Sequence, residues 1–212
     1  STRKESSAAS DVYKRQHVSS MLADFMALNP HVTVHLEATN RRVDVVAEAM
    51  DIAIRVRPPP IQDSDLVMRV LSDRGQCVVA SPALFNKHEL PKTPADIAEW
   101  PSLALGTPQQ THVWNLFGPD GAHVSLHHHP RFVTGDMMAL RDAALAGVGI
   151  VQLPRMMIRD QLAAGTLLSL LPDWAPRREI VHVVFPSRRG VLPSVRALID
   201  YLAERFQALN ED

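Results

Sequence analysis

Histidines gather in the middle of the sequence, where they could bind a metal ion. His127, His128 and His129 are consecutive, and His112 and His123 lie shortly before them. Zinc needs three or four converging ligands, whereas adjacent residues of a strand point to opposite faces, so only His127 and His129 of the run share a face. No HExxH or CxxC motif accompanies them. We therefore predict no metal site and interpret the run as a solvated edge beside a β-hairpin.

Motifs of the common catalytic sites are missing from the sequence. It contains no GxSxG nucleophile elbow, no Walker loop and no GxGxxG fingerprint. The single cysteine, Cys77, lies in an aliphatic segment and has no partner thiol. A free cysteine in such a segment usually behaves as a small buried hydrophobic residue. We predict that the chain is not an enzyme and uses no cofactor.

A polar segment, Thr134-Gly135-Asp136, precedes a stretch with helical periodicity that begins at Met137. The first backbone N–H groups of a helix have no partner within the helix, and the helix dipole adds roughly half a positive charge at that end. A carboxylate ligand could therefore bind there. The alternative is that Asp136 simply caps the helix.

Two further segments place polar side chains after apolar stretches. Arg55 lies near the end of the segment DIAIRV (51–56), and a guanidinium can hold a carboxylate through two hydrogen bonds. Pairing with a nearby acid is the alternative for this side chain. Thr39 and Asn40 follow another strand pattern and offer neutral hydrogen bonds, although most such Asn residues only satisfy turn backbone groups.

The composition narrows the class of protein. The 212 residues include 22 Lys and Arg against 23 Asp and Glu. This balance argues against binding of nucleic acid or anionic membranes through bulk charge. No apolar run approaches the ~18 residues of a membrane helix, and a chain of this length can bury a sizeable core.

Helical and strand patterns alternate along the chain. The helical patterns are at 18–29, 43–50, 137–147, 156–164 and 194–209, with a further helix start at Thr93-Pro94. The strand patterns are at 32–36, 51–56, 68–71, 76–80, 102–106, 149–153, 167–171 and 179–185, and a hairpin is predicted from 113–117 and 122–126. The early order of helix, strand, helix and strand is typical of a parallel sheet, but a first strand is missing at the front.

Residues 1–16 (STRKESSAASDVYKRQ) differ from the rest of the sequence. They have no apolar core of a secretory signal and no periodicity. Their small polar residues cannot bury enough surface to offset the entropy cost of ordering. We interpret them as a disordered or foreign leader.

Four segments stand in a characteristic order and spacing. They are VDVVAEAMDIAIRV (43–56), VVASPALF (78–85), TGDMMALRDAALAGVGIVQLP (134–154) and SVRALIDYLAERF (194–206). Together they resemble the effector-binding domain of LysR-type transcriptional regulators, over about residues 17–207. Each segment alone is a weak signal, but four in register make coincidence improbable. The N-terminal winged helix-turn-helix of that family has no counterpart in these residues.

The resemblance implies an α/β fold similar to type 2 periplasmic binding proteins, with two lobes and a small-molecule cleft between them. Lobe I would comprise 17–74 plus 181–212, and lobe II would comprise 75–180. Ligands of open α/β sheets bind outside the carboxyl ends of strands and at helix N-termini. The effector-binding residues expected on this basis are Thr39, Asn40, Arg55, Thr134, Gly135 and Asp136.

The function implied by the resemblance is the sensing of a small, anionic metabolite, expected to be a carboxylate, by a cytoplasmic bacterial regulator. Such a regulator would form homodimers or homotetramers and contact DNA only through the absent N-terminal domain, with no role for a membrane. Three alternatives stay open: a transported-solute receptor of the same fold, an enzyme that reuses the cleft, and a non-functional fragment lacking its first strand.

Overall fold

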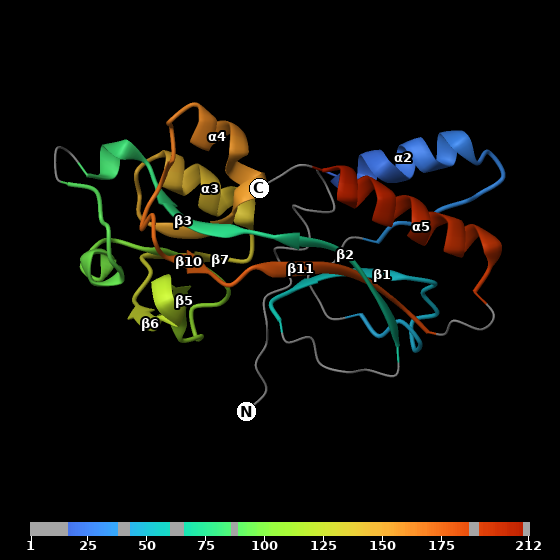
Figure 1. The fold of residues 1–212 in the computed structure, drawn as a ribbon, viewed down its shortest axis with the longest axis horizontal. Coiled ribbons are helices and arrows are strands. Elements are labelled where there is room, and N and C mark those ends of the chain that lie inside the picture. Colours follow the sequence, from blue (N-terminus) through green and yellow to red (C-terminus); the bar gives the residue numbers. More distant parts are fainter. Residues whose placement is uncertain (1–16, 38–42, 60–65, 86–88, 187–190, 210–212) are drawn as a thin grey trace. The chain divides into compact units, whose positions relative to one another are not determined.

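The computed structural model describes residues 17–37, 43–59, 66–85, 89–186 and 191–209 (Figure 1). The chain forms two compact units. Unit 1 is made from residues 1–74 and 179–211, and unit 2 from residues 75–178. Among the described residues, no helix combines the length and apolar character needed to cross a bilayer.

Unit 1 is a sheet with two helices on one face (Figure 1). Its three strands stand in the order β1-β11-β2, and both ladders are antiparallel. Helix α5 packs on β2, and α2 packs on α5, where the rings of Phe25 and Tyr201 are 5.4 Å apart. The elements of unit 1 are α2 (Ser19–Leu28), β1 (Ala53–Arg57), β2 (Val67–Arg74), β11 (Glu179–Phe185) and α5 (Pro193–Ala208).

The amphipathic pattern of the C-terminal segment explains how α5 is held. Its buried residues are Leu198, Ile199, Leu202, Ala203 and Phe206. They recur at helical spacing and form one apolar stripe against the sheet. On the exposed side Arg69 of β2 forms an ion pair with Asp200. The side chain of Arg74 donates hydrogen bonds to the carbonyls of Phe206 (3.3 Å) and Leu209 (3.4 Å), which lie at the C-terminal end of the helix.

The structure corrects the prediction for the front of unit 1. Residues 32–37 form no strand, and the predicted helix over 43–50 is a turn at 45–49. A strand needs a hydrogen-bonded neighbour, and none of the described strands pairs with 32–37. The turn ends at Ala49, whose positive φ of 51° is incompatible with a continuing right-handed helix. The predicted parallel sheet is therefore wrong for the described strands of this unit.

Unit 2 contains three small sheets. Their strand orders are β8-β3-β9, β10-β5-β6 and β4-β7, and β4-β7 is the parallel pair. The strands are β3 (Gln76–Ala80), β4 (Leu103–Leu105), β5 (His112–Phe117), β6 (His123–His128), β7 (Phe132–Thr134), β8 (Val151–Pro154), β9 (Leu168–Ser169) and β10 (Ala175–Pro176). The helices are α3 (Met137–Leu145) and α4 (Arg159–Ala163), with 3-10 helices at Pro82–Leu84, Pro94–Ile97, Pro119–Gly121 and Arg155–Ile158.

The core of unit 2 lies between these sheets. It is a cluster of buried residues: Val78, Ala80, Phe85, Ile97, Trp114, Leu116, Ile150, Leu170 and Leu171. The predicted hairpin is confirmed as β5 and β6. The predicted helix start at Thr93-Pro94 is also confirmed, although the element is a short 3-10 helix with a capping box to Asp96. The predicted helix over 156–164 is divided into a 3-10 turn and α4.

Gly149, which follows α3 in the chain, permits the close approach of two chain segments. A Cβ atom at Gly149 would lie 2.6 Å from the carbonyl oxygen of Pro101. On either side of this contact Ile150 donates to Pro101 (2.8 Å) and Leu103 donates to Ile150 (2.9 Å). Only a residue without a side chain fits between these hydrogen bonds.

Candidate functional site

The segment before α3 lies at the carboxyl ends of a parallel strand pair. Thr134 ends β7, opposite Leu105 of β4, and its carbonyl accepts a hydrogen bond from the N–H of Gly106 (3.0 Å). Both strands therefore end where α3 begins. This is the position at which ligands bind in open α/β sheets.

The side chains of this segment organise the start of the helix. The Asp136 carboxylate accepts a hydrogen bond from the N–H of Met138 (2.8 Å), so the predicted cap of α3 is confirmed. The Thr134 hydroxyl accepts one from the N–H of Asp136 (3.1 Å). Open space surrounds the position that a Cβ atom of Gly135 would take. The start of α3 is thus ordered, and one of its backbone N–H groups already donates to the Asp136 carboxylate.

Arg55 belongs to unit 1, whereas Thr134, Gly135 and Asp136 form one segment of unit 2. It lies on β1 opposite His182 of β11, and its guanidinium donates to the carbonyl of Val43 (2.9 Å). That bond joins the strand to the segment before the turn at 45–49. Thr39 and Asn40, the other two predicted effector residues, lie outside the described residues.

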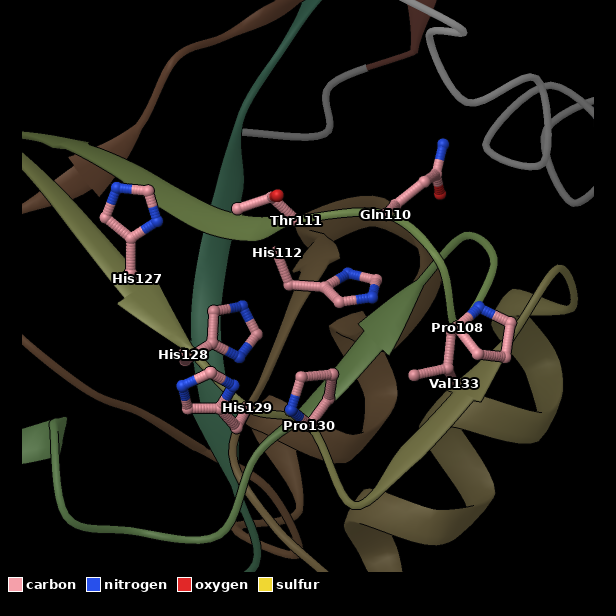
Figure 2. Close-up of a pocket in the computed structure, with 9 residues that line it drawn as sticks. All are labelled: Pro108, Gln110, Thr111, His112, His127, His128, His129, Pro130 and Val133. Carbon is pink, nitrogen blue, oxygen red and sulfur yellow. The ribbon is translucent and has the colours of Figure 1, made fainter.

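A cavity in unit 2 was not predicted from the sequence. Its volume is about 350 Å³, within the range of small-molecule sites. Figure 2 shows imidazole rings from β5 and from the end of β6 around it. We call this cavity the histidine pocket; its lining residues are Pro108, Gln110, Thr111, His112, His127, His128, His129, Pro130 and Val133.

His128 is held firmly in the wall of the histidine pocket. It is only 9% exposed, and its ring stacks on Trp114 with the ring centres 4.0 Å apart. The Ser102 hydroxyl lies 2.7 Å from its Nδ1. Burial, followed by the nearby imidazoles of His112, His129 and His127, lowers the pKa of His128 to about 4. The ring is therefore neutral at pH 7.

His112 faces His128 across the hairpin. The two residues are direct cross-strand partners, and their ring centres are 6.0 Å apart. The Nε2 atom of His112 is buried and has no hydrogen-bond partner. A buried ring nitrogen without a partner is rare and marks a place where a ligand can supply the missing bond.

The structure corrects part of the sequence interpretation of the histidine run. His127 and His129 are exposed, as a solvated edge requires, but His128 points inward and is buried. In the described part of the chain, no three His, Cys, Asp or Glu side chains are placed to hold a metal ion.

The predicted character of Cys77 is confirmed. The thiol is buried in β3, 5% exposed, and burial raises its pKa to about 11. It stays protonated at neutral pH and is a poor nucleophile.

The comparison with known families decides the identity of the domain. The model of the LysR substrate binding domain matches residues 8–207. The chain belongs to this family. It is an effector-binding regulatory domain of a LysR-type transcriptional regulator, and the family is not enzymatic.

Solved structures of LysR regulatory domains share its fold. The chain is similar to the regulatory domain of AphB from Vibrio vulnificus, with a TM-score of 0.76 and 27% identity over 91% of this chain and 93% of that chain. It is also similar to the CrgA regulatory domain from Neisseria meningitidis, with a TM-score of 0.76 and 25% identity over 92% of this chain and 94% of that chain. The predicted α/β fold of the type 2 periplasmic-binding-protein kind is thereby confirmed.

Curated LysR relatives are longer proteins. The chain is 29% identical to an HTH-type transcriptional regulator of Xanthomonas campestris, over 89% of this chain and 55% of that protein. It is 29% identical to the HTH-type transcriptional regulator PtxR of Pseudomonas aeruginosa, over 92% of this chain and 61% of that protein. The chain thus spans between half and two thirds of these relatives.

The sequence contained a signal for the histidine pocket in this LysR domain. Pro119-Asp120-Gly121 fixes the hairpin turn, and pairing outward from it places His112 opposite His128. The period-two alternation of β6 then puts His128 on the face opposite His127. The hydrogen bond between His128 and Ser102 could not be predicted from this pairing, because Ser102 precedes a strand of another sheet.

Proposed function

We propose that the effector of this domain is a small carboxylate metabolite that binds at the start of α3 and is held by Arg55. The observation that carries the proposal is the parallel pairing of β4 and β7, which end together where α3 begins. Backbone N–H groups and the positive end of the helix dipole favour an anion there.

Arg55 supplies the counter-charge in this proposal. It is half-buried, and its bond to the Val43 carbonyl gives the guanidinium a defined position. A planar guanidinium can bind a carboxylate through two parallel hydrogen bonds. Thr39 and Asn40 are proposed to contribute neutral hydrogen bonds, and Gly135 leaves room for the ligand.

Effector binding would shift the population of domain conformations rather than drive a reaction. We propose that the domain acts as a homodimer or homotetramer in the cytoplasm and that a helix-turn-helix domain of the kind named in its relatives contacts DNA. The outer side of α2 supports assembly, because Met26 and Leu28 are exposed, Leu28 to 69%.

Titration calorimetry of the chain with a panel of small carboxylic acids tests the proposal. We expect saturable heat with at least one acid in the wild type, its loss in Arg55→Ala and weaker binding in Arg55→Lys, which keeps the charge but not the paired hydrogen bonds. Arg69→Ala is the matched control, because it removes an exposed arginine of the same sheet. Wild-type affinity in Arg55→Ala would exclude Arg55, and absence of saturable heat with every acid would exclude a carboxylate effector.

A further inference from the structure

We propose that the outer edge of β6 is a self-association surface, on which β6 of a second copy of this chain pairs as an antiparallel strand. The surface belongs to unit 2 alone. It is distinct from the outer side of α2, a helix of unit 1, and it does not depend on an effector. A chain that assembles through both surfaces forms a tetramer, whereas either surface alone gives a dimer.

β6 is paired on one side only. It is the last strand of its sheet, whose order is β10-β5-β6 (Figure 1). Among the described strands only β5 pairs with it. Outside the sheets, no backbone hydrogen bond within the described part of the chain reaches residues 123–128. An edge strand of this kind offers a row of N–H and C=O groups to another strand.

The hairpin turn determines which backbone groups face the outer edge. The N–H of Gly118 donates to the Ala122 carbonyl (2.8 Å), and hydrogen-bonded pairs alternate with non-hydrogen-bonded pairs along an antiparallel ladder. His123, Ser125 and His127 therefore occupy the non-hydrogen-bonded positions opposite β5. Their N–H and C=O groups point away from β5, toward a strand that docks on the outer edge.

The strand itself carries no barrier to pairing. Natural edge strands are commonly protected by Lys or other charged residues, by Pro or by a β-bulge. The six residues of β6, HVSLHH, include no Lys, Arg, Asp, Glu or Pro. Their pairing with β5 runs without a register shift, so no bulge twists the strand away from a partner.

The sequence of β6 identifies a second copy as the occupant. From His123 to His127 it reads histidine, apolar residue, serine, apolar residue, histidine, which is the same in both directions. Antiparallel pairing about Ser125 places His123 opposite His127 of the second copy. It also places Val124 opposite Leu126, and Ser125 opposite its own counterpart. Each side chain thus meets one of its own class, which is the self-complementarity that a two-fold interface needs.

The same register satisfies the backbone. It joins outward-facing positions to outward-facing positions, and each such pair can exchange two hydrogen bonds. A register shifted by one residue would set outward-facing groups against inward-facing ones and lose these bonds. Val124 and Leu126 are half-buried, and Leu126 packs on the core of unit 2. The pairing therefore also extends an apolar face that each copy already has.

Amide hydrogen exchange in the full 212-residue chain, read by NMR at increasing protein concentration, tests the pairing. The N–H groups of His123, Ser125 and His127 should exchange rapidly in dilute protein and at least about tenfold more slowly once the chain assembles. The N–H groups of the intervening positions face β5 and should be protected at every concentration. This alternation is specific to strand pairing, because contact between side chains alone does not protect every second amide.

Substitutions of Ser125 assign the assembly to this edge. Ser125→Lys sets two like charges directly opposite each other, so it should weaken the association at least about tenfold and restore rapid exchange. The side chain is exposed, so the fold of each copy should tolerate the change. Ser125→Ala keeps the backbone groups and should assemble like the wild type. The matched control is Asn115→Lys, which adds the same charge to the neighbouring strand, away from the two-fold axis.

Three results would overturn the proposal. The first is rapid exchange of the three outward-facing amides at every concentration. The second is an association of Ser125→Lys equal to that of the wild type or of Asn115→Lys in sedimentation velocity. The third is protection already present in dilute protein, which would show that another segment of the same chain covers the edge.

Two further variants separate this surface from the proposed function. Arg55→Ala should abolish effector heat and leave the concentration-dependent protection of β6 unchanged. Leu28→Glu places a charge on the outer side of α2, where Leu28 is 69% exposed, and should also leave that protection unchanged. Loss of the protection in either variant would contradict an independent surface on β6.

Discussion

The Ser102 hydroxyl and the His128 ring form a buried hydrogen bond of 2.7 Å that joins two sheets of unit 2. Ser102 directly precedes β4, whereas His128 ends β6. The bond therefore fixes the hairpin on the strand pair that leads to α3. It also gives His128, the most deeply buried imidazole of the histidine pocket, a hydrogen-bond partner at Nδ1.

Removal of this bond should destabilise the fold. We expect Ser102→Ala to lower the free energy of unfolding by about 1–3 kcal/mol, because His128 Nδ1 remains buried without a partner. Urea denaturation of the variant measures this change. Ser125→Ala is the control, since it removes an exposed hydroxyl of the same hairpin that is bonded to Asn115 (2.8 Å). Equal losses in the two variants would contradict the importance of the buried bond.

Stability should fall on mild acidification. The pKa of His128 is about 4 in the folded chain and 6.5 in a model peptide, so the unfolded chain binds more protons between these values. Burial also lowers the pKa of His182, which acts in the same direction. The contribution of the neutral His128 ring to stability is fully present above about pH 6.5 and is lost progressively toward pH 4. Urea denaturation across this range measures the slope, and His128→Gln should reduce it; an unchanged slope would show that His128 does not contribute.

The cap of α3 should contribute measurably to stability. We expect Asp136→Ala to cost about 1 kcal/mol, because the N–H of Met138 loses its acceptor. Asp136→Asn keeps an acceptor oxygen and should restore most of the loss. Thermal unfolding of the three proteins compares them. If Asn restores nothing, the carboxylate charge rather than the hydrogen bond stabilises the helix start.

Gly149 and Gly135 should respond differently to the same substitution. Gly149→Ala places a methyl group 2.6 Å from the Pro101 carbonyl and should cost about 1–3 kcal/mol. Gly135→Ala meets open space and should leave the unfolding transition close to that of the wild type. Chemical denaturation of both variants tests the contrast. Similar behaviour of the two would mean that the chain relaxes around Gly149 without penalty.

Elements with local signals were predictable from the sequence. The cap and helix of α3, the β5-β6 hairpin and the apolar stripe of α5 each depend on residues within a few positions of one another. Propensity, capping and turn chemistry act at this range. The structure confirms these elements with boundaries shifted by one to a few residues.

Features that depend on distant partners were not predictable. Residues 32–36 have the alternation of a strand, but alternation does not reveal whether a neighbouring strand is available. The hydrogen-bond partner of the buried His128 ring is Ser102, 26 residues earlier in the chain. Of the predicted effector site, the Asp136 cap followed from local rules, whereas the participation of Arg55 stays a prediction because the pattern around it does not reveal what its guanidinium binds.

Arg74 links the end of β2 to the end of α5, so we expect the two ends to open together in hydrogen exchange. Its guanidinium binds the carbonyls of Phe206 and Leu209, although 132 and 135 residues separate the partners. Fraying of the last helical turn would withdraw two acceptors from a cation that is only 6% exposed. Amide protons at both places should therefore exchange with deuterium at matched rates, as one cooperative opening unit rather than as a loose terminus.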